Sequence, residues 1–296
     1  MITIVIPTYN RLKYLVDAYL SVINQDNNKY ILYIVDDSTN NETYEYFSKI
    51  NLHKNVFYIR NKKNLGIVKN FSKSFYLAKT KWVTLLSDDD ILDSNFVSKS
   101  LEVLNGSNKA IVVASFRDID INGSCLRNYL HKKISLSKVE AFVSFFYGNY
   151  PVAGISGFFL NTELCKELFK IKEYPNAILS DSYLCFSASA LGGMETIDRV
   201  IYSRRRWPGS LSSGGVGTVS KAMNLYITYR AQKEFQKDLY DLWVLLINQN
   251  VDNGILKNMK IDIEDYCKQN AINNGIIFQI KKRYNLFSKK IKDKRW

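Results

Sequence analysis

The stretch VTLLSDDDIL, residues 83–92, places three consecutive aspartates at the end of an apolar run, and the interpretation of this chain depends on what compensates their charge. A run of apolar and β-prone residues leads into Asp88, Asp89 and Asp90, and the chain then turns apolar again. The apolar run predicts a buried strand, and adjacent carboxylates at its end repel one another unless a cation or ligand donors compensate. An alternative is that the aspartates cap the helix expected to follow, where the helix dipole would favour them.

Strands and helices alternate along the first 115 residues. Short apolar runs predict buried strands at 2–6, 30–35, 56–59 and 82–86. Apolar residues at helical spacing predict helices at 12–22, 41–50 and 66–79. This β-α-β-α pattern is typical of a mostly parallel sheet covered by helices.

The pattern is looser after residue 110. Strands are predicted at 110–116 and 195–203, and helices at 135–146, 161–171 and 178–193. Residues 204–217 are rich in arginine, glycine and serine and predict a loop, and helices are expected from there to residue 296. We therefore expect three parts, with bounds 1–115, 116–216 and 217–296.

Polar clusters follow three of the predicted strands, at residues 7–10, 36–38 and 87–90. In parallel sheets ligands bind at the carboxyl ends of the strands, where these clusters would meet. The glycine-rich phosphate loops of dinucleotide enzymes and of P-loop NTPases are absent. A divalent cation bridging carboxylates to a diphosphate would let the aspartates serve a nucleotide site. A plain turn is the alternative for Asp36 and Asp37.

The amino-acid composition indicates which classes of binding partner and which cellular compartment to expect. The net charge of +13 over 296 residues favours anionic partners, namely nucleotides, nucleic acid or a membrane surface. Four widely spaced cysteines without a CxxC pair predict reduced thiols in a cytosolic protein rather than a zinc site or disulfides. We expect neither a secretory leader nor a membrane span, because no apolar run approaches about 20 residues.

Four motifs in order carry a resemblance to a known family. VIPTYNR (5–11), IVDDSTN (34–40), NKKNLGIVKNF (61–71) and LLSDDDIL (85–92) are similar to the motifs of family 2 glycosyltransferases with a GT-A fold. The resemblance is strong over about the first 120 residues and weaker to about residue 215. It implies that Mn²⁺ or Mg²⁺ is the cofactor and that a nucleotide-sugar is the donor.

The resemblance also implies roles for single residues. Asp36 and Asp37 would contact the base and ribose, and Asn64 and Gly66 would close a loop over them, although a loop-to-helix turn is an equal alternative there. Asp90 is the favoured metal ligand and Asp88 the second candidate, while Asp88 or Asp89 would bind the ribose. Relatives often carry a further aspartate where this chain has Ser87. The donor-binding set is Pro7, Thr8, Tyr9, Asp36, Asp37, Asn64, Gly66, Asp88, Asp89 and Arg205.

Two residues further along would complete the chemistry that the resemblance implies. Asp181 is the candidate general base of an inverting reaction, with Ser180 where glutamate is usual; a helix N-terminal aspartate is the alternative. Arg205 would hold the diphosphate, unless 204–217 is only a solvated basic loop. Trp207 replaces a usual histidine and could stack on a sugar or lipid.

Residues 281–296 hold eight basic residues and one acidic residue. Apolar residues recur at helical spacing from Ile277 to Ile291, so 277–296 predicts an amphipathic basic helix that binds an anionic membrane surface. The alternative is a terminal helix packed on the protein. A nucleic-acid role is disfavoured, because the charge is concentrated at one end and no nucleic-acid motif accompanies it.

The resulting expectation is a metal-dependent, inverting glycosyltransferase at the cytoplasmic membrane face. It would move a sugar, from UDP by preference, to a hydroxyl of an undecaprenyl-diphosphate-linked glycan in bacterial polysaccharide or O-antigen synthesis. A sugar-nucleotide nucleotidyltransferase is one alternative, but it should carry a glycine-rich basic loop where this chain reads PTYNRLKY. A non-catalytic anion- or nucleic-acid-binding protein is another, and it would not need Asp36, Asp37, Asp90 and Asp181 together.

Overall fold

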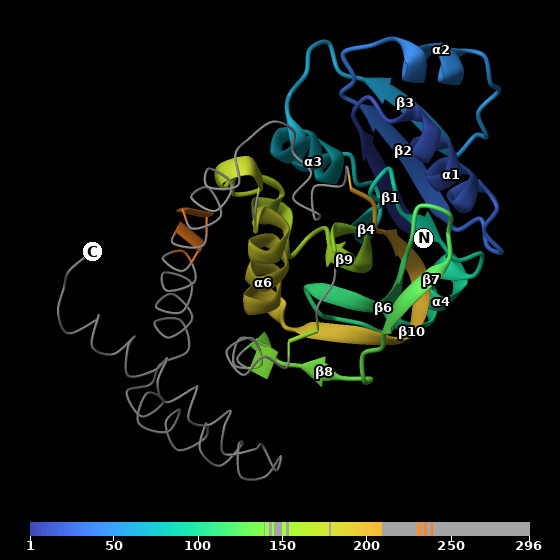
Figure 1. Ribbon diagram of the computed structural model, residues 1–296. Coiled ribbons are helices and arrows are strands. Elements are labelled where there is room, and N and C mark those ends of the chain that lie inside the picture. Colours follow the sequence, from blue (N-terminus) through green and yellow to red (C-terminus); the bar gives the residue numbers. More distant parts are fainter. Residues whose placement is uncertain are drawn as a thin grey trace, which may run out of the picture.

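The computed structural model places helices around one twisted sheet (Figure 1). It describes residues 1–138, 154–177 and 179–208 and the single positions 140, 141, 144, 150, 151, 230, 231, 234, 235 and 238. The sheet order is β3-β2-β1-β4-β9-β6-β10-β5, with β7 paired to β6 and β8 paired to β10.

The first half of the sheet is parallel, as the sequence predicts. β1 (Ile2–Thr8) lies between β2 (Tyr30–Asp36) and β4 (Trp82–Leu85), and β3 (Val56–Arg60) pairs with β2. All seven residues of β1 are buried, because helices cover both faces of the sheet. The register sets Thr8 opposite Asp36, which brings two predicted site positions to the same edge.

Alternation along β1 divides the core into two layers. Ile2, Ile4 and Ile6 pack in the cluster that contains the buried residues of α1 (Leu12–Ile23), α2 (Glu42–Ser48) and α4 (Phe96–Leu104). Val5 faces the other cluster, which holds residues of α3 (Ile67–Tyr76) and α6 (Ser180–Gly192). Successive side chains of a strand point to opposite faces, so one short apolar run supplies both layers.

The second half of the sheet is mixed rather than mostly parallel. β6 (Ile111–Ile119) is parallel to β10 (Met194–Arg205), whereas β9 (Phe158–Asn161) runs antiparallel between β4 and β6. The short strands β5 (Ile91–Leu92), β7 (Cys125–Tyr129) and β8 (Ser135–Leu136) also pair antiparallel. β6 crosses the expected boundary at 115/116, so the first two expected parts share one sheet.

One expected helix is absent, and the alternative in which the aspartate triplet caps a helix is wrong. Residues 161–171 form the end of β9, a turn and the 3₁₀ helix η2 (Lys166–Phe169) instead of an α-helix. Asn161 Oδ1 accepts the main-chain N–H groups of Glu163 and Leu164, which turns the chain directly after the strand. The aspartate triplet does not cap a helix either, because β5 follows it and α4 begins only at Phe96.

Local sequence signals place two helix ends within residues 116–216. Ser137 and Glu140 cap each other's main-chain N–H groups, and positions 138, 140, 141 and 144 are helical. Residues 135–136 belong to β8, so this helix begins later than expected. Gly193 ends α6 at a φ of 74°, where a Cβ would collide with the main-chain oxygen of Leu136.

The expectations for residues beyond 208 fall almost wholly outside the described residues. These include the helices expected after 217, the loop from 209 on and the basic tail at 277–296. In the part of the chain that the structure does describe, no helix combines the length and the apolar character that crossing a bilayer requires.

Candidate active site

Thr8 joins the polar ends of three strands. Its hydroxyl donates a hydrogen bond of 2.8 Å to Asp88 Oδ2, and its main-chain oxygen accepts the N–H of Asp37 at 2.9 Å. Thr8 is 2% exposed and ends β1. The carboxyl ends of β1, β2 and β4 therefore meet at one edge, as the sequence predicts for a ligand site in an α/β sheet.

Asp36 faces into the protein. Its Oδ2 accepts the hydroxyl of Tyr58 at 2.5 Å, and its Oδ1 accepts the N–H of Ser38 at 2.8 Å. The side chain of Asp36 is fully buried. Burial of Tyr58 and its hydrogen bond to Asp36 both raise the pKa of Tyr58. Asp36 thus fixes the turn after β2, and its predicted contact with the base and ribose stays a prediction.

Asp37 holds a loop that lies far away in sequence. Its carboxylate accepts the side-chain amides of Asn61 and Asn64 and the main-chain N–H groups of Leu65 and Gly66, all at 2.7–3.0 Å. Gly66 has a φ of 81°, a backbone conformation that glycine adopts without strain. The predicted base-closing loop is therefore built on Asp37, which does more than a plain turn requires.

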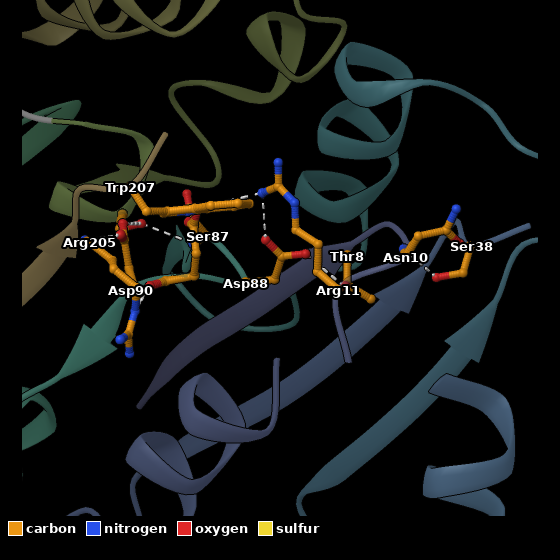
Figure 2. A network of polar contacts seen from close by, with 11 residues as sticks. Thr8, Asn10, Arg11, Ser38, Ser87, Asp88, Asp90, Arg205 and Trp207 are labelled. Atoms are coloured by element: carbon orange, nitrogen blue, oxygen red, sulfur yellow. Dashed lines mark hydrogen bonds and ion pairs between the residues drawn. The ribbon is translucent and has the colours of Figure 1, made fainter. Parts of the chain in front are cut away.

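Asn10 is a site residue to which sequence reasoning assigned no role. It adopts a φ of 52°, and its side chain donates to Thr39 Oγ1 and accepts the N–H of Thr39. Its own N–H donates to Ser38 Oγ at 2.9 Å (Figure 2). An asparagine after a strand tolerates this conformation and bonds nearby main chain, so the signal lay in the PTYN motif.

A basic cavity of about 500 Å³ opens beside this loop. Three of its lining residues are cationic, and Asn64 is the predicted donor-binding residue among them. The lining is Ser38, Thr39, Arg60, Asn61, Lys62, Lys63 and Asn64. Tyr9 is exposed near this edge, whereas Pro7 is buried within β1. The positive lining would raise the local concentration of an anionic ligand.

Each aspartate of the triplet is buried, and each has different partners. Asp88 bonds to Thr8 and Arg11, and Asp89 Oδ2 to Arg11 Nη1 and Trp207 Nε1. Asp90 accepts the hydroxyl of Ser156 at 2.6 Å and the main-chain N–H of Arg205 at 2.9 Å. Ser156 comes from the 3₁₀ helix η1 (Ile155–Gly157), beside the end of β4.

Burial makes the charged state of the triplet costly. It raises the pKa of Asp88 to about 6 and that of Asp90 to about 7. These values include the negative charge of Asp89, which raises both, and the guanidinium of Arg11, which lowers the pKa of Asp88. The site therefore attracts positive charge near neutral pH.

Arg11 supplies such a charge. Its Nη1 lies 3.2 Å from Asp88 Oδ1 and 3.4 Å from Asp89 Oδ2. The Trp207 ring lies 5.4 Å from the Arg11 guanidinium and 4.9 Å from the Tyr14 ring. Figure 2 shows Arg11 beside Asp88, with the indole of Trp207 alongside. No local sequence pattern indicates this pairing, because Arg11 and the triplet lie far apart along the chain.

Arg205 is held by the protein itself. Its guanidinium donates to the main-chain oxygens of Asp89 and Ile121 and to the carboxylate of Asp17. The side chain is buried, so a contact with a diphosphate would require some of these bonds to be exchanged. Its predicted role in diphosphate binding stays a prediction.

Asp181 lies in the first turn of α6, where its Oδ1 accepts the main-chain N–H of Ser182 at 2.8 Å. Burial raises the pKa of Asp181, while the hydrogen bonds from Ser182 and, to a smaller extent, the positive charge of Arg204 lower it. The charge of Arg204 also lowers the pKa of Asp90. Asp118 anchors Arg204 through two bonds of 2.8 and 3.2 Å and accepts a further bond from Arg206. Arg204 and Asp118 are a second pair that sequence reasoning did not single out.

The chemistry of the triplet fits a hard divalent cation. Mg²⁺ and Mn²⁺ prefer oxygen ligands and commonly take one or two carboxylates from the protein and the rest from phosphate and water. Across the described residues, no three histidine, cysteine or acidic side chains converge on a point where they could hold an ion by themselves. A metal here would thus depend on ligand oxygens and would compete with Arg11 for Asp88 and Asp89.

The same sheet architecture occurs in solved structures. TarS 1–349 of S. aureus in complex with UDP-GlcNAc superposes with a TM-score of 0.59 at 16% identity, covering 85% of this chain and 67% of that one. The complex of the same protein with UDP gives a TM-score of 0.54 over 77% of this chain and 69% of that one. The protein has the GT-A fold.

The family follows from the sequence match. The model of glycosyl transferase family 2 matches residues 3–169, and the chain belongs to this family. Relatives include the uncharacterized glycosyltransferase MJ1057 of Methanocaldococcus jannaschii, 26% identical over 48% of this chain and 50% of that protein. The putative teichuronic acid biosynthesis glycosyltransferase TuaG of Bacillus subtilis is 24% identical over 48% and 56%. The chain thus spans about half the length of these curated relatives.

We predict that Asp37→Ala frees the loop at residues 61–66. Loss of a charged acceptor should speed amide hydrogen exchange of Leu65 and Gly66 by roughly tenfold to a hundredfold. Exchange measured by mass spectrometry checks this, with Asp120→Ala as control because Asp120 accepts two main-chain N–H groups in another turn. Unchanged exchange at Leu65 and Gly66 would show that the carboxylate does not hold the loop.

Proposed function

We propose that the protein is a metal-dependent, inverting glycosyltransferase that moves a sugar from a nucleotide donor, UDP by preference, to a hydroxyl of a lipid-linked glycan. The observation that carries this proposal is the link that Thr8 makes between the loop held by Asp37 and the buried aspartate triplet. A nucleotide-sugar needs a base site next to carboxylates that can hold a cation against its diphosphate, and the loop held by Asp37 and the aspartate triplet lie at the same sheet edge.

The donor site is supported by the basic cavity and by the neighbouring structures. Base and ribose would enter the cavity beside Ser38 and Asn64, and the diphosphate would extend toward Asp88 and Asp90. Bound UDP and UDP-GlcNAc in the TarS structures support a uridine nucleotide as donor. Asp90 and Asp88 would hold the divalent cation, whose chemistry is to neutralise charge on the departing diphosphate.

Asp181 is proposed as the general base. The acceptor hydroxyl must lose its proton as it attacks the anomeric carbon, and a carboxylate with a raised pKa is a better proton acceptor near neutral pH than an ordinary aspartate. The positive charge of Arg204, which Asp118 fixes, lowers the pKa of Asp181 and of Asp90. It would help keep Asp181 ionised while the donor is bound.

The acceptor is proposed from the relatives and the basic charge. TuaG is described as a teichuronic acid biosynthesis glycosyltransferase, which supports a bacterial surface polysaccharide as the product. An acceptor on undecaprenyl diphosphate and membrane binding by residues 277–296 are both proposals, and the tail lies outside the described residues. The nucleotidyltransferase alternative is disfavoured because α1 begins at Leu12, leaving no room for a glycine-rich basic loop after β1.

The first test is a panel of UDP-, GDP-, dTDP- and CDP-sugars with and without Mn²⁺. We expect UDP-sugars to bind and to be slowly hydrolysed only with the metal, as followed by calorimetry and nucleotide release. Asp90→Asn should lose metal-dependent binding, while the exposed Asp198→Asn should keep it. Equal binding with and without Mn²⁺ would contradict metal dependence, and binding of another nucleotide class would overturn the UDP assignment.

A second prediction concerns Arg11. Arg11→Gln removes the positive charge that competes for Asp88 and Asp89, so Mn²⁺ should bind without donor about fivefold to tenfold more tightly. Without metal the variant should unfold at lower temperature than the native protein, because two buried carboxylates lose their counter-ion. Metal titration and thermal unfolding measure both effects, with Arg199→Gln as the exposed control. Weaker Mn²⁺ binding in Arg11→Gln would refute the competition.

A third prediction concerns pH. The base must be ionised, so transfer should fall as pH drops through the raised pKa of Asp181. Asp181→Asn should lower the transfer rate roughly 10²- to 10⁴-fold and leave Mn²⁺-dependent donor binding intact, because the acid sensitivity of donor binding comes from Asp88 and Asp90. Transfer and donor binding measured across pH separate the two effects, and Glu163→Gln, an exposed site, should retain both native profiles. Transfer by Asp181→Asn at the native rate would assign the base elsewhere.

A further inference from the structure

Residues 120–133, here called the β7 hairpin, expose large apolar side chains in an unusual concentration. Leu130 is 70% exposed, the highest value among the large apolar residues that the structure describes, and Leu126 and Ile121 are 58% and 47% exposed. β7 has β6 as its only partner strand within the described residues. Figure 1 shows it in green at the side of the sheet. Three exposed large apolar side chains within one short segment are a candidate interaction surface.

The hairpin is a built element rather than a loose loop. Asp120 Oδ1 accepts the N–H groups of Asn122 and Ser124 at the turn. Tyr129 stacks on Phe116 with ring centroids 4.5 Å apart and donates its hydroxyl to Asp118. Leu130 directly follows β7 and is exposed, whereas Tyr129 at the end of β7 packs against Phe116 of β6. The leucines are therefore presented by a fixed scaffold.

All charged residues of the β7 hairpin after Asp120 are basic. Residues 121–134 contain Arg127, Lys132 and Lys133 and no acidic residue, and all three cations are exposed. Exposed leucines flanked by basic side chains match a bilayer surface with anionic headgroups, where apolar groups insert and cations meet phosphate. A second copy of this surface, or another basic segment, would bring like charges together.

The hairpin is tied directly to the candidate active site. Arg205 donates from Nη1 to the main-chain oxygen of Ile121 and from Nε to the main-chain oxygen of Asp89. The turn of the hairpin thus lies at the same sheet edge as the triplet. A membrane bound to this hairpin would hold the site close to the headgroup layer, where the diphosphate of a lipid-linked acceptor lies.

We infer that the β7 hairpin is a membrane-binding surface whose partner is an anionic lipid bilayer. This inference rests on the proposed function, because membrane binding would bring the active site to a lipid-linked acceptor. It is independent of residues 277–296, since it depends only on the leucines and cations of the hairpin. The hairpin would supply the apolar contact and part of the electrostatic attraction.

The test is cosedimentation of the full-length chain with phosphatidylglycerol–phosphatidylcholine vesicles and with pure phosphatidylcholine vesicles. We expect Leu126→Gln/Leu130→Gln to lower partitioning onto the anionic vesicles by about tenfold or more. Lys132→Gln/Lys133→Gln should lower partitioning onto anionic vesicles by roughly tenfold and leave partitioning onto neutral vesicles unchanged.

Matched controls separate surface chemistry from folding. Leu20 and Leu191 are 42% and 45% exposed on other elements, so Leu20→Gln/Leu191→Gln should partition as the native chain does. Lys29→Gln/Lys54→Gln serves the same purpose for charge, because both lysines are exposed. Each variant should bind UDP-sugar in the absence of vesicles as the native chain does.

Three results would overturn the inference. The native chain could fail to bind anionic vesicles, the hairpin variants could bind them as well as native, or the leucine variant could change only the oligomeric state. Failure of the proposed function is a different result: donor binding or transfer would be absent while vesicle binding still depends on Leu126 and Leu130.

Discussion

The ion pair between Arg11 and the buried carboxylates of Asp88 and Asp89 is the interaction on which the arrangement of the site depends. Without a cation, three adjacent aspartates at the end of a buried strand would repel each other in a poorly solvated place. Arg11 lies just before α1, so the pair fixes the start of that helix against the end of β4. Trp207 then packs on the same guanidinium, which brings the end of β10 to the same point.

Two buried carboxylates of this edge are stabilised in different ways. Asp37 is satisfied by amide and main-chain N–H groups, which cannot leave without unfolding their loop. Asp88 is satisfied by a hydroxyl and by the guanidinium of Arg11, a side chain that is partly exposed. The first arrangement permanently fixes the loop that lines the cavity. The second leaves Asp88 with a counter-ion that a ligand or a metal ion can replace.

The sequence predicts the parallel half of the fold well, because short apolar runs and helical spacing are local signals. It also predicts which strand ends gather polar residues. It fails where distant segments decide the outcome: β9 enters the sheet antiparallel, and residues 161–171 form a turn because Asn161 bonds its own main chain. Arg11 and Arg204 acquire their positions from partners far away in the chain, which no local pattern reveals.

The long-range bonds of Asp90 have a consequence for synthesis on the ribosome. Its partners Ser156 and Arg205 lie 66 and 115 residues further along the chain. The strands β1 to β4 can therefore leave the exit tunnel and pair while the aspartate at their edge still lacks both donors. Until residue 205 has been added, Asp90 must remain hydrated or protonated. A pause in translation before that point would expose an unfinished, charged sheet edge to chaperones.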